Sequence, residues 1–268
     1  MGKLFFIIFF ASLGLNLSAQ SLEIEYRVRV NKNSVITTTE TRYYLKIKGQ
    51  VSTYYNTLED SLSQYIYAPH ATTSYRAKAG FLVAKLDDHH STCILERIYF
   101  KDYSSHSVIF NELINGRKLV HIKESYPLFD WKLLPNRDTI ILGYPCQRAV
   151  AEFRGRTYVA CFSPTLYPFG GPWKFEGLPG LILQVQSEDN YFIINPVKIT
   201  LNANIDTIEN PHAGKETLSW EAYVEATKAD LQQSLKKMKA MSAAGDDGGI
   251  KIVDSIEDMG IGELSFRK

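Results

Sequence analysis

Cysteine is scarce in this chain, and neither sign of charge is in excess. The three cysteines are Cys93, Cys146 and Cys161, and 30 basic residues stand against 29 acidic ones, a formal net charge of +1. An odd number of cysteines leaves at least one thiol without a disulfide partner. Because the charge is balanced, a polyanionic partner gains no overall electrostatic attraction. We therefore expect no nucleic-acid binding.

The short motifs of familiar catalytic sites are also absent. The sequence contains no Gly-x-Ser-x-Gly, no His-Glu-x-x-His, no Gly-x-x-x-x-Gly-Lys phosphate loop, no Cys-x-x-Cys and no dinucleotide fingerprint. No nucleophile is paired with a base at a recognisable spacing. The sequence therefore favours a non-catalytic protein without a cofactor, although missing motifs do not exclude an enzyme.

A long apolar stretch occurs at the N-terminus. It runs from Leu4 to Leu15 after Met1-Gly2-Lys3 and leads to the small-residue context Leu17-Ser18-Ala19-Gln20. This order is typical of a secretory signal peptide cleaved after Ala19, whereas a membrane anchor needs about 20 apolar residues. No cysteine follows that could carry a lipid. We expect residues 1–19 to be removed and the mature chain, without a transmembrane segment, to be exported to the periplasm or the outer-membrane periphery.

The mature sequence is dominated by strand patterns. Leu22 to Val30 alternates apolar and charged residues without a fault, which is typical of a half-buried antiparallel strand. Residues 37–47 repeat this pattern, and Lys48-Gly49-Gln50 offers a hairpin turn before residues 51–55. Further short β-rich runs extend to residue 201 with turn residues between them. We predict one β-rich domain over residues 20–268.

The period changes after residue 215. Ser219 can cap a helix with Glu221 in its first turn, and one apolar stripe follows, formed by Val224, Leu231, Leu235 and Met238. We predict an amphipathic helix over about 219–243 and then a C-terminal tail. The predicted fold class is mainly β (α+β): a large curved antiparallel sheet or open half-barrel with one long C-terminal amphipathic helix.

Four potential metal ligands occur in succession at Asp87-Asp88-His89-His90. Adjacent strand residues point to opposite faces, so further ligands would have to come from elsewhere. A solvated polar turn is the alternative interpretation and the one we favour. Asp87, His89 and His90 remain weak candidates for the metal site of a hydrolase.

Cys146 and Cys161 flank the predicted turn Arg154-Gly155-Arg156 at nearly equal distance. With Gly155 at the centre of this turn, Cys161 pairs with residues near Ala149, three positions from Cys146. A disulfide requires the two α-carbons to lie within about 7 Å. The register therefore favours two unpaired thiols.

The loop at 164–180 is rich in proline and glycine. Pro168, Pro172 and Pro179 each fix φ and lack an amide donor, which excludes a central strand or a helix interior. Leu178-Pro179-Gly180 suits a tight turn with glycine at a positive φ. This turn is expected to set the register of the next strand, in which Leu181, Leu183 and Val185 alternate into the core.

The loop also carries a resemblance to a known family. The run Gly177-Leu178-Pro179-Gly180-Leu181-Ile182 is similar to the signature of the GLPGLI proteins, exported proteins of Gram-negative bacteria without an established activity. Gly143-Tyr144-x-Cys146-x-Arg148-Ala149, Phe153-x-Gly155-Arg156 and Gly171-Pro172-x-Lys174-Phe175 also match, so the specific likeness covers about 130–200. At Cys161 the family usually has an aromatic residue. The resemblance implies export but no particular chemistry.

Aromatic residues are abundant, with 16 tyrosines, 14 phenylalanines and 3 tryptophans. On a concave sheet they could hold an apolar ligand or a partner protein. Trp173, Phe175 and Leu178 would form one lip of that surface, with Leu231 and Leu235 as a helical cover. The alternatives are the metal-dependent hydrolase and a structural accessory of an outer-membrane complex.

Overall fold

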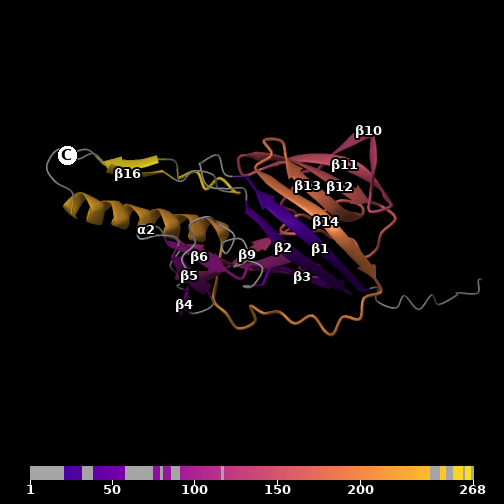
Figure 1. Cartoon of the computed structure of the whole chain (residues 1–268), viewed down its shortest axis with the longest axis horizontal. Coiled ribbons are helices and arrows are strands. Elements are labelled where there is room, and N and C mark those ends of the chain that lie inside the picture. Colours follow the sequence, from indigo (N-terminus) through magenta and orange to yellow (C-terminus); the bar gives the residue numbers. More distant parts are fainter. Residues whose placement is uncertain are drawn as a thin grey trace, which may run out of the picture.

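The computed structural model describes residues 21–31, 39–57, 75–78, 81–85, 91–115, 118–241, 248–251, 256–261 and 263–266 (Figure 1). The expected signal peptide 1–19 lies outside these residues. So do Asp87, His89 and His90, the weak metal-site candidates.

Within the described residues, twelve strands form one open sheet in the order β10-β11-β12-β13-β14-β1-β2-β3-β7-β8-β9-β15. All neighbours pair antiparallel except β15, which runs parallel to β9. The strands are β1 (Ser21–Val30), β2 (Thr39–Lys48), β3 (Val51–Tyr55), β7 (Ile98–Asp102), β8 (Ser107–Ile114), β9 (Lys118–Ser125), β10 (Lys132–Ile141), β11 (Tyr144–Phe153), β12 (Arg156–Ser163), β13 (Leu181–Ser187), β14 (Phe192–Leu201) and β15 (Thr217–Leu218). The predicted fold class, a large and mostly antiparallel sheet with one C-terminal helix, is confirmed.

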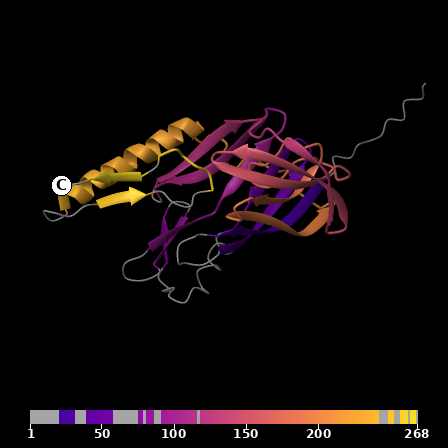
Figure 2. The same ribbon diagram turned by 90° about the horizontal axis from the view of Figure 1, so that it is seen from above.

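Two small sheets accompany the large one. One contains β4 (Tyr75–Lys78), β5 (Phe81–Lys85) and β6 (Ser91–Leu95), and the other is a hairpin of β16 (Gly248–Lys251) and β17 (Glu263–Phe266). Figure 2 shows the β16–β17 hairpin alongside the C-terminal helix.

The alternating sequence of β1 places apolar side chains on one face of the sheet and charged side chains on the other, as expected. Leu22, Ile24, Tyr26 and Val28 are buried in the core, and the charged residues between them lie on the other face. Because side chains in a strand alternate with a period of two, this single register fixes which face of the sheet is covered.

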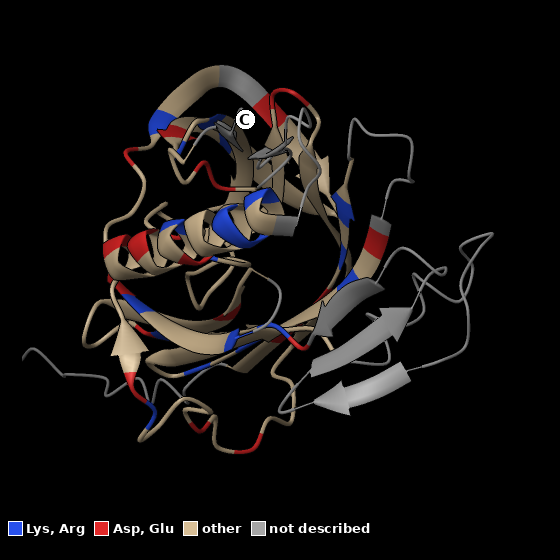
Figure 3. Cartoon of the chain, turned by 90° about the vertical axis from the view of Figure 1, so that its left-hand side faces the viewer, with Lys and Arg blue, Asp and Glu red and all other residues tan. Residues whose placement is uncertain are grey.

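Helix α2 (Trp220–Met241) starts where its cap predicts. The Ser219 hydroxyl accepts a hydrogen bond from the Ala222 amide at 3.2 Å. Hydrogen bonds from the Glu221 backbone amide and then from the Ser219 side chain lower the pKa of the Glu221 carboxyl. Figure 3 shows the helix across one end of the curved sheet, with acidic residues toward one end of the helix and basic residues toward the other. In the part of the chain that the structure describes, no helix combines the length and the apolar character needed to cross a membrane.

The predicted helical cover needs a correction. Tyr223 in the first turns of α2 belongs to the main core, but Leu231 and Leu235 are buried farther along the helix, which also contacts the β16–β17 hairpin. They do not belong to the core cluster that contains Trp173. Of the predicted stripe, Leu231 and Leu235 are buried and Val224 is half-buried, but Met238 is 43% exposed. The prediction is wrong at Met238, which lies near the end of a 22-residue helix that extends beyond the sheet (Figure 1).

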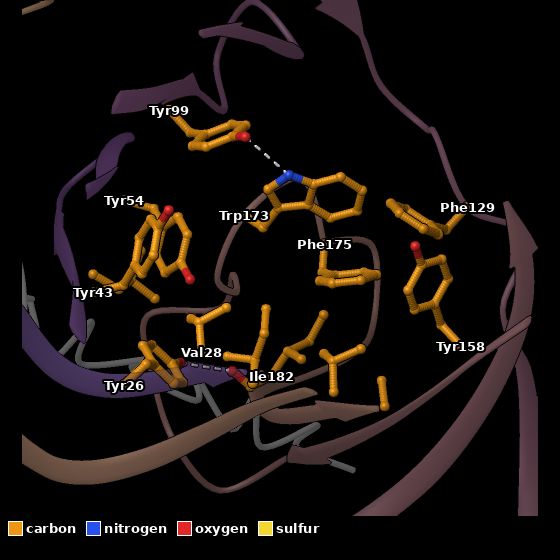
Figure 4. Packing of buried hydrophobic residues seen from close by; sticks show 14 of the residues in the cluster. Tyr26, Val28, Tyr43, Tyr54, Tyr99, Phe129, Tyr158, Trp173, Phe175 and Ile182 are labelled. Carbon is orange, nitrogen blue, oxygen red and sulfur yellow. Dashed lines mark hydrogen bonds between the residues drawn. The ribbon is translucent and has the colours of Figure 1, made fainter. Parts of the chain in front are cut away.

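The concave side of the sheet is filled by the loop between β12 and β13. Trp173 and Phe175 project from this loop into the middle of the core, with 3% and 0% of their surface exposed (Figure 4). Their ring centroids lie 4.9 Å apart, Phe175 lies 4.9 Å from Phe129, and the Trp173 indole donates a hydrogen bond to the Tyr99 hydroxyl at 3.1 Å. Trp173 and Phe175 are therefore core residues and do not form the lip of an open surface.

Candidate functional site

The loop leads into β13 in the predicted register. Leu181, Leu183 and Val185 are all buried, as expected. The turn before them differs from the prediction, because the positive φ belongs to Gly177 (+89°) and the Gly180 amide bonds to the Leu178 carbonyl at 2.8 Å. A Cβ at Gly180 would collide with the carbonyl oxygen of Ser163 and lie 2.9 Å from Phe162 Cδ2. Glycine is needed there for close approach to β12.

A buried lysine holds the loop in place. Lys101 on β7 is fully buried, and its Nζ donates to the carbonyl oxygens of Gly171 at 2.9 Å and Phe175 at 2.7 Å. Burial lowers the pKa of Lys101 to about 7, although the nearby Glu176 carboxylate opposes the shift. An ammonium group with two carbonyl partners fixes the turn 171–175 against the sheet.

An open cavity of about 450 Å³ lies beside this loop. Segments far apart in sequence form it: the turn between β2 and β3, the residue after β7, and both ends of the loop. Its lining consists of residues 49–50, 103, 167–170 and 176–179. The predicted binding residue Leu178 belongs to this lining, whereas Trp173 and Phe175 do not.

The lining combines aromatic rings with a few polar groups. Tyr167 and Phe169 are 46% and 47% exposed and meet edge to face, with centroids 5.6 Å apart. The Tyr103 hydroxyl forms a 3.0 Å hydrogen bond with Ser52, and Gly170 leaves room for it, since a Cβ there would lie 2.5 Å from this oxygen. Such a wall can cover an apolar ligand on one side.

Glu176 supplies the acidic group of the cavity. Its side chain is half-buried, and its backbone carbonyl accepts a 2.8 Å hydrogen bond from the Trp131 indole. Burial raises the pKa of Glu176, while the positive charge of Lys101 opposes the rise. In either protonation state the carboxyl keeps an oxygen that can accept a hydrogen bond from a ligand at the cavity wall.

A second polar cluster surrounds the loop residue Lys174. The Lys174 ammonium, fully buried, contacts Glu124 of β9 at 2.6 Å and both Glu257 oxygens at 2.9 and 2.8 Å. Arg154 forms ion pairs with the same two carboxylates. Burial alone would raise the pKa of Glu124, but Lys174 and Arg154 hold it below the ordinary value. Two cations thus share two carboxylates.

Aromatic rings enclose these two cations. The Arg154 guanidinium lies 3.7 Å from the ring centroid of Trp220, and Lys174 Nζ lies 4.5 Å from the same ring and 4.1 Å from that of Phe110. Ring faces attract cations without hydrogen bonding to them. The cluster therefore joins β8, β9, the β11–β12 turn, the loop and α2.

Two histidines form a third polar group. The Nδ1 atoms of His121 on β9 and His212 lie 3.0 Å apart, and His212 Nε2 lies 3.2 Å from the Ile98 carbonyl oxygen. Since a carbonyl only accepts, Nε2 of His212 carries the proton and its Nδ1 accepts from His121. Burial, then the neighbouring His121, lowers the pKa of His212 to about 4.

Cys146 and Cys161 are both buried, and both thiols are free. The observed register confirms that the two cysteines are not opposite each other on β11 and β12. Around the Arg154-Gly155 turn, Cys161 pairs with Arg148 and Ala160 pairs with Ala149. Among the residues that the structure describes, no three histidine, cysteine or acidic side chains are grouped to hold a metal ion.

Sequence reasoning missed the polar residues of the cavity and of the Lys174 cluster. One signal was present in β9, where Glu124 follows Val120 and Ile122 at the same buried phase. Another lay in the loop, where Lys174 and Glu176 alternate with the aromatic residues Trp173 and Phe175. No local pattern indicates that Tyr103, Tyr167 and Glu176 meet, because their proximity depends on how the loop folds into the sheet.

Comparisons with known proteins give little beyond this description. No protein-family model matches the chain, and no curated protein matches it. Among solved structures, PNGF-II in a C2 crystal form has a TM-score of 0.49 and 14% identity, covering 89% of this chain and 36% of that one. PNGF-II in a P21 form has a TM-score of 0.47 and 14% identity, covering 87% and 35%. The chain spans about a third of the length of these structures, and no activity follows from similarity at this level.

Proposed function

We propose that this chain is an exported, non-catalytic envelope protein that binds a small, mostly apolar ligand in the cavity at Leu178. The observation that carries the proposal is the cavity itself, about 450 Å³ in volume and open to solvent beside two exposed aromatic rings. Small-molecule sites in proteins occupy roughly 300–1,000 Å³ and combine apolar walls with a few polar groups. A concave site of this size favours a small molecule over a partner protein.

The lining suggests the chemistry of the ligand. Tyr167, Phe169 and Leu178 provide apolar contact, and Glu176 provides an acceptor for one hydroxyl or amine donor. We infer an apolar body with one hydrogen-bond donor. Among the described residues that line the cavity, no nucleophile is paired with a base.

The sequence supports the cellular setting of this proposal. The apolar segment at 1–19 has the order of a signal peptide, and the GLPGLI-type motif at Gly177–Ile182 resembles that of exported proteins. On these grounds we propose periplasmic or outer-membrane-peripheral localisation and membership of the GLPGLI family.

A fluorescent probe tests the binding site. N-phenyl-1-naphthylamine is a neutral, apolar molecule with one N–H donor, so it matches the inferred ligand. We expect saturable fluorescence enhancement with the wild-type protein and at least tenfold weaker binding with Tyr167→Ala/Phe169→Ala. Glu176→Gln keeps the shape of the site but weakens the acceptor, so we expect a smaller loss.

The control removes exposed apolar surface elsewhere. Leu133 and Ile140 on β10 are 56% and 73% exposed and do not line the cavity. Leu133→Ala/Ile140→Ala should bind the probe as the wild type does. Equal loss of binding in both double variants would indicate nonspecific adsorption and contradict the proposal.

A further inference from the structure

The Glu257 carboxylate comes from a separate short segment of the chain. Residues 256–261 follow the C-terminal helix and pair with no strand of the large sheet. Glu257 nevertheless reaches the buried cations, contacting Lys174 Nζ with both oxygens and forming an ion pair with Arg154. Its side chain is 11% exposed, against 0% for Lys174.

The segment is held in the way that a bound peptide is held. The Asp258 amide donates to the Arg154 carbonyl at 2.9 Å, and the Tyr158 hydroxyl donates to the Ile256 carbonyl at 3.0 Å. Ile256 and Met259 pack half-buried against the main core on either side of the two acidic residues. Gly155 provides the space, since a Cβ there would lie 2.9 Å from Asp258 Cβ.

The positive charges of Lys174 and Arg154 require an anion in the place that Glu257 occupies. Without Glu257, two buried cations would share the single carboxylate of Glu124, and N–H groups of Lys174 and Arg154 would lose an acceptor. Uncompensated buried charge is strongly unfavourable, and a guanidinium beside an ammonium matches a planar, two-oxygen anion. Trp220 lies against both cations and limits the room for a larger group.

We propose that Lys174 and Arg154 form a carboxylate-binding site that Glu257 occupies in cis and that another carboxylate fills when the segment leaves. The incoming carboxylate has two conceivable sources, a free small carboxylate or the glutamate side chain of an acidic peptide similar to Ile256-Glu257-Asp258-Met259. This inference does not depend on the proposed ligand of the Leu178 cavity.

Acetate tests the shared chemistry, because it has the same heavy atoms as the part of Glu257 beyond Cβ. In the full-length Glu257→Ala variant at pH 7, we expect sodium acetate at tenfold excess over its Kd to raise the Tm by about 3 °C relative to sodium chloride of equal ionic strength. Glu257→Gln lacks the charge but fills the space, so acetate should leave its Tm unchanged, as in the wild type.

A labelled peptide distinguishes the two sources. Fluorescence anisotropy would compare Ile-Glu-Asp-Met-Gly-Ile, the sequence of residues 256–261, with the same peptide carrying Gln for Glu. We expect at least tenfold tighter binding of the acidic peptide to Glu257→Ala than to wild type, and at least tenfold weaker binding of the Gln peptide. A response to acetate without peptide binding would assign the site to free carboxylates.

Two results would overturn the proposal. One is the same Tm for Glu257→Ala in acetate and in chloride, together with no discrimination between the peptides. The other applies if Glu257→Ala does not fold in chloride. In that case the proposal predicts that acetate present during refolding restores the native circular dichroism signal, and an unchanged unfolded signal in acetate would reject the site.

Discussion

At the scale of single residues, Gly180 is restricted by its neighbours and not by its own backbone angles. The pyrrolidine of Pro179 beside it is exposed, whereas any Cβ at Gly180 meets the backbone of Ser163. Backbone atoms cannot move aside as the end of a flexible side chain can. The two residues of this turn should therefore respond very differently to substitution.

Gly180→Val is expected to lower the free energy of unfolding by about 3 kcal/mol or to prevent folding, because β12 and β13 would be forced apart. Pro179→Ala should cost less than about 1 kcal/mol, mainly through a more flexible unfolded chain. Urea denaturation monitored by tryptophan fluorescence measures both. A mild effect of Gly180→Val would mean that the close contact with Ser163 is not a constraint.

The His121–His212 pair predicts a pH dependence of stability. The folded-state pKa of His212 is about 4, below the ordinary value of 6.5, so the unfolded chain binds more protons between these two pH values. The contribution of neutral His212 to the free energy of unfolding is therefore fully present above pH 6.5 and is lost as the pH falls toward 4. Allowing for solvent screening, His212 should contribute about 2 kcal/mol to this fall.

His212→Gln should flatten the curve of unfolding free energy against pH over this range. The exposed His106 offers a control, and His106→Gln should leave the slope as in the wild type. If His212→Gln keeps the full slope of the wild type, the buried pair is not its origin.

At the scale of elements, the sequence predicted those parts that repeat a local pattern. Strand β1 follows from its alternation, α2 from Ser219 and its apolar stripe, and the turn after β11 from Gly155, whose φ is +78°. The order of the sheet could not be read in this way. Leu22 pairs with Leu201 and Tyr54 with Tyr99, and such pairs are selected by packing across the whole domain.

The candidate sites were less predictable than the elements that carry them. Leu178 was identified as a binding residue and lines the cavity, but Trp173 and Phe175 were expected at its lip and lie in the core. An aromatic residue in a proline-rich loop looks exposed when no partner strand is known. Lys101 and Glu124 fix the loop from distant strands, and no spacing in the sequence links them to it.

Substitution of Lys174 tests how much the buried ion cluster stabilises the packing of β9, the β11–β12 turn, the loop and α2. Lys174→Met leaves two carboxylates with one cation in a buried site, so we expect a loss of about 3–5 kcal/mol in unfolding free energy. Lys123→Met, at an exposed position of β9, should change it by less than about 0.5 kcal/mol. Similar stabilities of the two variants in guanidinium titrations would show that the cluster contributes little.

At the scale of the whole molecule, the loop from β12 to β13 converts an open sheet into a filled one. Its aromatic residues occupy the concave face (Figure 4), and two contacts anchor it to strands: Lys101 of β7 bonds to the Gly171 carbonyl, and Lys174 of the loop bonds to Glu124 of β9. A large ligand cannot enter the middle of such a sheet. The cavity at Leu178, which both ends of the loop line, is the site that we propose for binding.

Native mass spectrometry of the protein purified from the cells that naturally produce it tests this claim most directly. The proposed function predicts a small molecule bound at one site in the wild type, with its occupancy greatly reduced in Tyr167→Ala/Phe169→Ala and unchanged in Leu133→Ala/Ile140→Ala. A wild-type protein that carries no such molecule, or a molecule retained equally by both double variants, would contradict the assignment of the cavity as the binding site.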